Sequence, residues 1–513
     1  MKTKYGVVFV QIFSFLFFTQ VYSQSERFSE IGKMQRHDQI QKEDNVLLIN
    51  STSLDSFITA TMSEYHIPGL SACILKDGEL VWNHAYGYAD VERQIPVIDS
   101  TIFAIASISK TITGTALMQL YERGIFELGD NVKDYLPTDL QVVNPSYPND
   151  PITFKMILSH VSSIIDNWDI LDTLVVEGDS PISLYDGLKN YLVSGGAYYS
   201  EINYDSLSPA SKYSYCNIAT ALLGYIVEAI TDTTFEEYCY KHIFEPLNMN
   251  ETSWFLSNLD TNHVARPSTW TLKGYQSYPH WGHPFYPCGS LRTSSLQLAH
   301  FLNMFMQKGT LENSKILDNS TVALMTTIHY PEIPVEQGYP DSSQGLIWYQ
   351  EYFNDRLVWG HSGGSNGITT TMYYYEPDNS GVIVLTNGDL FLYPSPCKGV
   401  SEIVNTLFDF AVSCSTVIAV HDENVLSVFA LKQNFPNPFN SITNIEFALS
   451  HSGFVTLKIY TMLGEEVTTL VSENLSAGKY KYLWDAMGLA SGVYFYRLHA
   501  GEYKQTKKLI LMK

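Results

Sequence analysis

The sequence is poor in cysteine, in positive charge and in long apolar segments, and each shortage excludes a class of protein. Six cysteines occur in 513 residues, without the CxxC or Cys/His spacing of zinc sites. Lysine and arginine total 31 against 53 acidic residues, so the formal charge is −22. That charge argues against nucleic acid or an anionic membrane surface as a partner. A hydrophobic content of 45% predicts instead a chain that folds around a core.

The N-terminus has the pattern of a secretory signal peptide. Lys2 and Lys4 precede an apolar run over residues 7–18, and residues 21–23 (Val-Tyr-Ser) offer a cleavage point. A membrane anchor is the alternative, but the run is shorter than the about 20 apolar residues that span a bilayer. We therefore expect a signal peptide over 1–23 and a polar leader segment over 24–50.

An exported chain can oxidise its cysteines, so their pairing matters. Cys397 and Cys414 are the best candidates for a disulfide. We expect most of the others to be free, buried and small apolar residues, namely Cys73, Cys216, Cys239 and Cys288.

Hydrophobic periodicity places strands at both ends of residues 51–412 and helices between them. Asp77-Gly78 separates two apolar runs, which predicts a β-hairpin over 69–88. Strand patterns return at 369–375 and 382–385. Helical spacing is found over 107–123, after Asn217, from a possible Thr234/Glu237 capping box, over 298–307 and over 401–412. We therefore predict an α+β domain in which helices flank an antiparallel sheet.

The composition changes over residues 413–430, which we interpret as a linker. From residue 431 to 513 short strands alternate with turn residues about every 8–12 positions, as in small β-sandwiches. The chain is therefore expected to hold two domains, in agreement with its length.

Three short motifs supply the groups that serine acyl transfer needs. Ser107 begins a predicted helix, and Lys110 lies one turn later on the same face. Tyr215 and Asn217 form the second motif, and His361 heads the third. A serine hydroxyl needs a nearby base, which can be Lys110 with a lowered pKa or Tyr215 as a phenolate beside Lys110. Both proton paths stay open from the sequence.

Each motif alone is weak, because the same spacings recur at 395–398, 476–479, 147–149, 352–354 and 451–453. The ordinary alternatives are a helix-capping serine, a core tyrosine and a glycine-rich hairpin. Context favours Ser107, since a helix N-terminus offers unpaired N–H groups to a developing negative charge. Gly363 and Gly364 let a ligand approach the strand that follows His361. Backbone N–H groups of that strand, together with the N–H of Ser107, can then bind an oxyanion.

His280 and His283 have the look of a metal pair, but no third ligand is apparent. An aromatic loop is the better interpretation. We expect neither a metal nor another cofactor.

Taken in order, the three motifs resemble those of the class C beta-lactamase-like serine hydrolases. Similar segments surround them, so the resemblance covers about residues 50–412; these are 86–90 (YGYAD), 101–111, 157–163, 244–249 and 384–387. The resemblance implies a beta-lactamase/transpeptidase-like fold and an acyl-serine intermediate. It assigns attack to Ser107, proton exchange to Lys110 and Tyr215, orientation to Asn217, stabilisation of Tyr215 and substrate to His361, and the second oxyanion donor to Gly364.

Three departures from that family pattern bear on the substrate. His361 stands where true lactamases of this class carry lysine, which argues against β-lactam hydrolysis; His-x-Gly is more typical of esterase and D-aminopeptidase branches. Ser163 and Asn248 replace usual glycines, which affects loops. We expect esters or small amides as substrates, with a D-amino-acid peptidase or DD-carboxypeptidase, a weak beta-lactamase and a non-catalytic surface binding protein as alternatives. The segment 165–212, with Trp168, is expected to line or cover the cleft.

The tail resembles a type IX secretion C-terminal sorting domain. The similarity lies in residues 434–440 (NFPNPFN), 463–464, 491–494 and 507–509. It implies passage through the periplasm and export by the type IX machinery to the cell surface or the medium. Whether the tail is then removed stays open.

Overall fold

The computed structural model describes residues 51–335, 343–389, 396–413 and 430–512, the last range with gaps at 435, 441, 450–452, 476–477, 487–488 and 502. The predicted signal peptide and leader, and most of the predicted linker, lie outside these residues. The chain divides into two units, up to Ser413 and from Cys414.

A seven-stranded antiparallel sheet frames the first unit, with the strand order β12-β13-β14-β15-β1-β2-β3. The N-terminal and C-terminal parts of the unit meet where β1 pairs with β15, from Leu70 opposite Thr386 to Lys76 opposite Ser380. The strands are β1 (Gly69–Lys76), β2 (Glu79–Asp90), β3 (Ile95–Pro96), β12 (Tyr349–Phe353), β13 (Arg356–Ser365), β14 (Ile368–Tyr375) and β15 (Ser380–Thr386).

The predicted hairpin at Asp77-Gly78 is confirmed. Lys76 pairs with Glu79 across a two-residue turn, and Asp77 and Gly78 both have positive φ, 52° and 86°. That pair of angles matches a type I′ turn, whose twist suits the strands that it joins.

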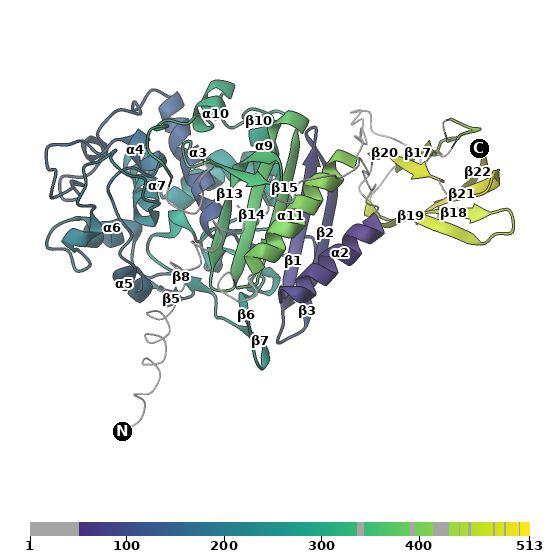
Figure 1. Cartoon of the computed structure of the whole chain (residues 1–513), viewed down its shortest axis with the longest axis horizontal. Coiled ribbons are helices and arrows are strands. Elements are labelled where there is room, and N and C mark those ends of the chain that lie inside the picture. Colours follow the sequence, from purple (N-terminus) through teal and green to yellow (C-terminus); the bar gives the residue numbers. More distant parts are fainter. Residues whose placement is uncertain are drawn as a thin grey trace, which may run out of the picture. The chain divides into compact units, whose positions relative to one another are not determined.

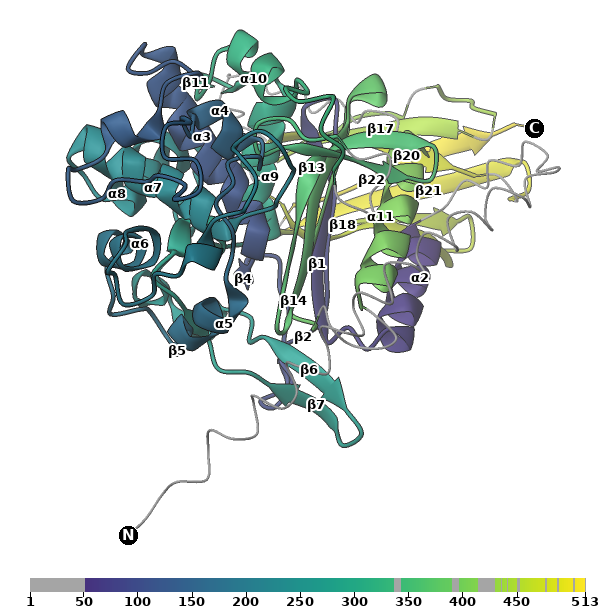
Figure 2. The same ribbon diagram turned by 60° about the vertical axis from the view of Figure 1, so that its left-hand side comes forward.

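Helices cover both faces of the sheet (Figures 1 and 2). Leu70, Ala72 and Ile74 of β1 pack with α2 (Ser51–Glu64) and α11 (Pro396–Ser413), whereas Cys73 and Leu75 belong to the core on the opposite face. This alternation follows from the two-residue period of a strand. The opposite face carries α9 (Ser295–Met306) and the helical region with α3 (Ser109–Glu122), α4 (Phe154–Leu158), α5 (Trp168–Leu171), α6 (Leu184–Leu192), α7 (Asn217–Thr231), α8 (Phe235–Cys239) and α10 (Asn319–Met325).

Short strand pairs connect this helical region. They are β4 (Phe103–Ala104) with β9 (Arg292–Thr293), β5 (Val176–Glu177) with β8 (Trp281–Gly282), β6 (Ser268–Thr271) with β7 (Gly274–Ser277), and β10 (Thr310–Leu311) with β11 (Ser314–Lys315). Of the helices in the described ranges, none alone is long and apolar enough to cross a membrane; α7 together with Phe235–Leu247 reaches that length and composition only across an 82° bend.

The predicted helices are present with shifted starts. The helix expected from residue 107 opens with a 3-10 turn, η1 (Ala106–Ile108), before α3, and it ends ahead of Gly124, whose φ is 69°. The Thr234 hydroxyl accepts the Glu237 N–H at 3.2 Å and begins α8, as half of a capping box. The helix expected over 298–307 begins earlier, at Ser295.

Cys73, Cys216, Cys239 and Cys288 are buried free thiols, as predicted. Cys397 is also free, so its expected pairing with Cys414 is wrong. Cys397 lies in the first turn of α11, and Ser413, the last residue of that helix, is 16 residues further on. A straight helix of that length extends about 24 Å, far beyond the about 7 Å between Cα atoms that a disulfide can bridge. Cys414 itself lies outside the described residues.

The second unit is a small β-sandwich, as expected. Its sheets have the orders β16-β17-β20 and β19-β18-β21-β22. One core draws on both sheets, for example through Phe447, Trp484 and Tyr496. The strands are β16 (Ala430–Leu431), β17 (Ile442–Leu449), β18 (Gly453–Thr461), β19 (Glu466–Leu475), β20 (Gly478–Asp485), β21 (Gly492–Ala500) and β22 (Tyr503–Leu511). Asn434 of the NFPNPFN segment anchors this unit, because its N–H donates to the Tyr496 hydroxyl at 2.8 Å.

Candidate active site

Ser107 lies in the turn η1, which leads from β4 into α3. Ala106, just before it, has a φ of 45°, in the left-handed region that is unfavourable for a side chain with a Cβ. Neighbouring elements hold the turn from two sides: the Thr370 hydroxyl donates to the Ile105 carbonyl at 3.0 Å, and the Ile105 N–H donates to Leu291 at 2.9 Å. The turn therefore presents Ser107, half-buried, in a fixed position.

Lys110 is fully buried and donates to three oxygens. The acceptors are Ser107 Oγ at 3.0 Å, Asn217 Oδ1 at 2.6 Å and the Cys288 carbonyl at 2.7 Å. The Nζ atom also lies 4.9 Å from the centre of the Tyr215 ring. The first two motifs predicted from the sequence thus meet at one ammonium group.

The charge of Lys110 is retained despite its burial. Burial lowers the pKa of Lys110, but the facing Tyr215 hydroxyl, with smaller contributions from Cys288 and Asp166, more than offsets it and raises the pKa above its ordinary value. Lys110 is therefore a cation at neutral pH. A lysine that already carries its proton cannot accept another one from Ser107.

Asp166 orients Asn217, and the sequence motifs did not include it. Its carboxylate accepts the Asn217 side-chain N–H at 2.7 Å and the backbone N–H groups of Asn217 and Ile218 at 2.9 and 3.1 Å. The amide oxygen of Asn217 is thereby left to Lys110. These contacts also cap the N-terminus of α7.

His160 holds the segment that carries Tyr215. Its carbonyl accepts the Ser214 N–H at 2.7 Å, its Nδ1 accepts the Cys216 N–H at 3.3 Å, and its ring centre lies 4.6 Å from that of Tyr215. Because a backbone N–H can only donate, Nδ1 carries no proton. Burial, with Lys110 and His361 nearby, lowers the pKa of His160 well below its usual value, so the ring is neutral.

His361 is a buried, neutral histidine. Burial and the charge of Lys110 lower its pKa to about 3. Nδ1 lies 2.6 Å from the Ser362 carbonyl, which can only accept, so Nδ1 carries the proton and Nε2 is an acceptor. Nε2 has no hydrogen-bond partner among the described residues. The ring centre lies 6.3 Å from that of Tyr215, so this acceptor is close to the site.

Gly363 and Gly364, which follow His361 on β13, have different structural roles. A Cβ on Gly363 would lie 2.2 Å from the Ile105 carbonyl oxygen, so only glycine lets β13 pass the turn that holds Ser107. Ser362 donates its N–H to the Tyr349 hydroxyl at 2.9 Å, on the side of β13 away from β14. Strand alternation puts the Gly364 N–H on the same edge, beyond the last residue of β13 that pairs with β12, Gly360.

A cavity of about 210 Å³ opens above these groups. Its lining includes Ser107, Asn217 and Gly364, and none of the lining residues is lysine or arginine. Trp168 lines it, as expected for the segment 165–212. The other lining residues are Ala106, Leu171, Asp172, Val175, Ile218, Trp281, His283, Phe285, Cys288, Gly289, Ser365 and Asn366.

Most residues predicted from the sequence are brought together: Ser107, Lys110, Tyr215, Asn217, His361 and Gly364. Gly363 differs, because it permits close packing and does not line the cavity. Sequence reasoning missed the part played by His160 and Asp166. The available signal was a histidine and a carboxylate in the otherwise mostly apolar and small stretch 157–166.

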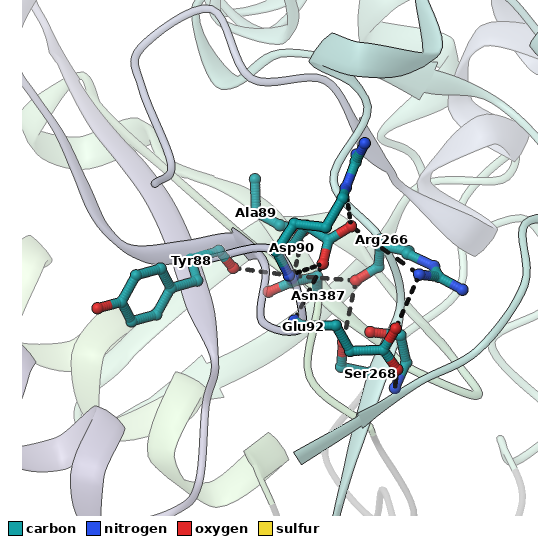
Figure 3. A network of polar contacts seen from close by, with 9 residues as sticks. Tyr88, Ala89, Asp90, Glu92, Arg266, Ser268 and Asn387 are labelled. Carbon is teal, nitrogen blue, oxygen red and sulfur yellow. Dashed lines mark hydrogen bonds and ion pairs between the residues drawn. The ribbon is translucent and has the colours of Figure 1, made fainter. Parts of the chain in front are cut away.

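Two further segments that resemble the family meet in a structural network rather than at the cavity (Figure 3). Asn387, after β15, donates its side-chain amide to the carbonyls of Tyr88, Ala89 and Arg266 at 3.0–3.1 Å. Asp90 accepts the Arg93 guanidinium at 2.8 Å. Burial alone would raise the pKa of Asp90, but the hydrogen bonds from Arg93 help to lower the pKa below its ordinary value. The network joins the ends of β2 and β15 to the segment before β6.

Comparisons with known proteins identify a family for each of the two units. A family model described as Beta-lactamase matches residues 54–392, and one described as a secretion system C-terminal sorting domain matches residues 433–512. Protein flp of Staphylococcus aureus (strain NCTC 8325 / PS 47) is 26% identical over 337 residues, which are 65% of this chain. The chain spans only 62% of the length of this curated relative.

Solved structures show the same fold. The octameric penicillin-binding protein homologue from Pyrococcus abyssi has a TM-score of 0.58 and 23% identity, over 90% of this chain and 97% of that chain. The D-amino acid amidase from Ochrobactrum anthropi SV3 has a TM-score of 0.56 and 19% identity, over 71% and 99%. These likenesses confirm the predicted beta-lactamase/transpeptidase-like architecture. With the family model matched over more than half of its length, the chain belongs to the beta-lactamase family, and it ends in a type IX secretion sorting domain.

Proposed function

We propose that this chain is an exported serine hydrolase that forms an acyl intermediate on Ser107 and acts on esters and small amides. The observation that carries the proposal is the convergence on Lys110: its ammonium contacts both the Ser107 hydroxyl and the Asn217 amide oxygen beside an open cavity. A serine held against a fixed cation and a phenol has the parts that nucleophilic catalysis requires.

Tyr215 is the better candidate for the base, because the pKa of Lys110 is raised. The Tyr215 phenolate takes the Ser107 proton as Oγ bonds to the substrate carbonyl carbon. The oxyanion so formed is bound by the N–H groups of Ser107 and Gly364. Collapse breaks the bond to the leaving alcohol or amine, which receives the proton from Tyr215. Water then attacks the acyl-serine by the same proton path and restores the hydroxyl.

The site favours substrates without a free carboxylate. His361 is neutral where a lysine would supply a cation, and its Nε2 can accept from Tyr215 or from a substrate N–H. The cavity lining holds no lysine or arginine and includes the apolar side chains of Leu171, Ile218 and Phe285. β-Lactams and D-Ala-D-Ala peptides carry a carboxylate that this lining would leave without a cation. The D-amino acid amidase of the same fold keeps amides among the candidates.

Export completes the proposal. The sorting domain implies contact with the type IX secretion machinery. The predicted signal peptide would deliver the chain to the periplasm first. We place the mature protein at the cell surface or in the medium.

A fluorophosphonate probe, which modifies activated serines, tests the proposal. Wild-type protein should be labelled, and Ser107→Ala should not. The kcat/KM of Ser107→Ala for an ester should be lower than that of wild type by at least about 10³-fold. Circular dichroism should show that the variant is folded. Lack of labelling in folded wild-type protein would favour a non-catalytic binding protein. A parallel panel of esters, amides, a β-lactam and D-Ala-D-Ala peptides would refute the substrate proposal if the carboxylate-bearing compounds were preferred.

A further inference from the structure

We propose that Asp166 is a positioning residue for the reaction: it fixes the Asn217 amide so that the oxygen faces Lys110, and thereby sets the Lys110 ammonium against Ser107. The inference rests on the acyl-serine reaction proposed above. It concerns a residue outside the three motifs, on the loop between α4 and α5.

The hydrogen bonds of Asp166 have a fixed polarity. A carboxylate can only accept, so the part of the Asn217 amide that faces it at 2.7 Å is the NH₂ group. The oxygen on the other side of that amide then accepts from Lys110 at 2.6 Å. Lys110 continues to Ser107 Oγ at 3.0 Å. The Asp166 carboxylate at one end of this series therefore fixes which group donates in each of its hydrogen bonds.

The backbone contacts make Asp166 a rigid reference point. The N–H groups of Asn217 and Ile218 donate to it, at the N-terminus of the 15-residue helix α7. The helix dipole favours an anion there. A cap of this kind needs only the backbone donors, so the additional bond to the Asn217 side chain is what distinguishes positioning from capping.

The variant Asp166→Asn reverses the polarity of one group while keeping the shape. An asparagine can still accept the backbone N–H groups through its oxygen, but its NH₂ would face the NH₂ of Asn217. If Asn217 flips in response, its NH₂ faces the Lys110 ammonium, again donor against donor. Either outcome displaces Lys110. The double variant Asp166→Asn/Asn217→Asp restores the sequence of donors and acceptors at the same net charge.

The experiment is a double-mutant cycle with Asp166→Asn, Asn217→Asp and the double variant. Asp166→Asn should lower kcat by about 10²-fold with little change in KM, as for a misplaced catalytic group. The labelling rate should fall in parallel. In the double variant it should be about tenfold higher than in Asp166→Asn. Asp179→Asn is the matched control, because the Asp179 carboxylate accepts the N–H groups of Leu256 and Ser257 at 2.7 and 2.9 Å without touching any motif residue.

The same cycle on the free energy of unfolding reports the pairing without using activity. The double variant should be more stable than the two single variants predict together. Unchanged kcat in Asp166→Asn, a loss no larger than in Asp179→Asn, or a folded double variant no faster than Asp166→Asn would overturn the inference. Wild-type protein that is not labelled would refute the acyl-serine function; the stability cycle would then still decide whether Asp166 orients Asn217.

Discussion

Protonation of single side chains decides how this site works. Lys110 stays charged because Tyr215, Cys288 and Asp166 more than offset its burial, whereas His361 stays neutral because burial and Lys110 act in the same direction. Of these two side chains Lys110 is the cation, and it lies beside Ser107. This arrangement differs from a site in which a second cation would bind a substrate carboxylate.

The pKa of His361 predicts a pH-dependent stability. Folded His361 titrates at about pH 3, whereas an unfolded histidine titrates near 6.5. Between these values the unfolded chain binds the additional proton, so stability is lost as the pH falls below about 6.5. Relative to His361→Gln, the free energy of unfolding of wild type should fall by up to about 1.4 kcal/mol per pH unit in this window. Urea denaturation at several pH values measures it, and parallel curves for the two proteins would contradict it.

Contacts between elements fix the position of the turn that holds Ser107. β13 passes directly over η1, and Gly363 makes that approach possible. Thr370 of β14 donates a hydrogen bond to the carbonyl of Ile105, the residue just before the turn. The sheet thus supports the serine that the sequence places at the start of a helix.

Replacing the glycine at this crossing should therefore displace the turn. A Cβ in Gly363→Ala would lie 2.2 Å from the Ile105 oxygen and 2.6 Å from Thr370 Oγ1. We expect a loss of about 1–3 kcal/mol in stability. We also expect kcat to fall by about 10²-fold, because a shift of about 1 Å misaligns the serine. Gly129→Ala is the control, since nothing lies within 4 Å of its added Cβ. Equal kinetics for the two variants would refute this account.

At the scale of the whole molecule, the proposed active site and the sorting domain lie in separate units. Every group of the proposed site lies before Ser413, and the core of the C-terminal sandwich shares no residue with the two cores of the first unit. Each unit therefore buries its own apolar surface, which is the main requirement for folding independently.

Removal of residues 414–513 tests this separation. The shortened protein should retain the labelling rate and the kcat/KM of the full chain, because no catalytic group is lost. In a host with the type IX machinery it should remain in the periplasm, while the full chain reaches the surface or the medium. Cell fractionation with the fluorophosphonate label follows both. Loss of labelling in a folded, shortened protein would show that the tail contributes to the site.

Much of this protein could be predicted from the sequence, because the relevant signals are local. The Asp77-Gly78 hairpin, the helix after Ser107 and the strand at 369–375 depend on turn chemistry and periodicity within a few residues. The order Ser107, Tyr215, His361 was similarly visible as short motifs. Asn248 could be recognised as a replaced glycine, and its φ of 57° explains why glycine suits that position.

Tertiary structure decided what depends on groups far apart in the chain. Asp166 contacts Asn217 from 51 positions away, and His160 contacts Cys216 from 56. The charge of Lys110, the neutrality of His361 and the packing role of Gly363 likewise follow from burial and from neighbours on other elements. Periodicity records which face of an element is apolar, but not which polar group from a distant segment will meet it there. That pairing exists only once the sheet and the helices have assembled.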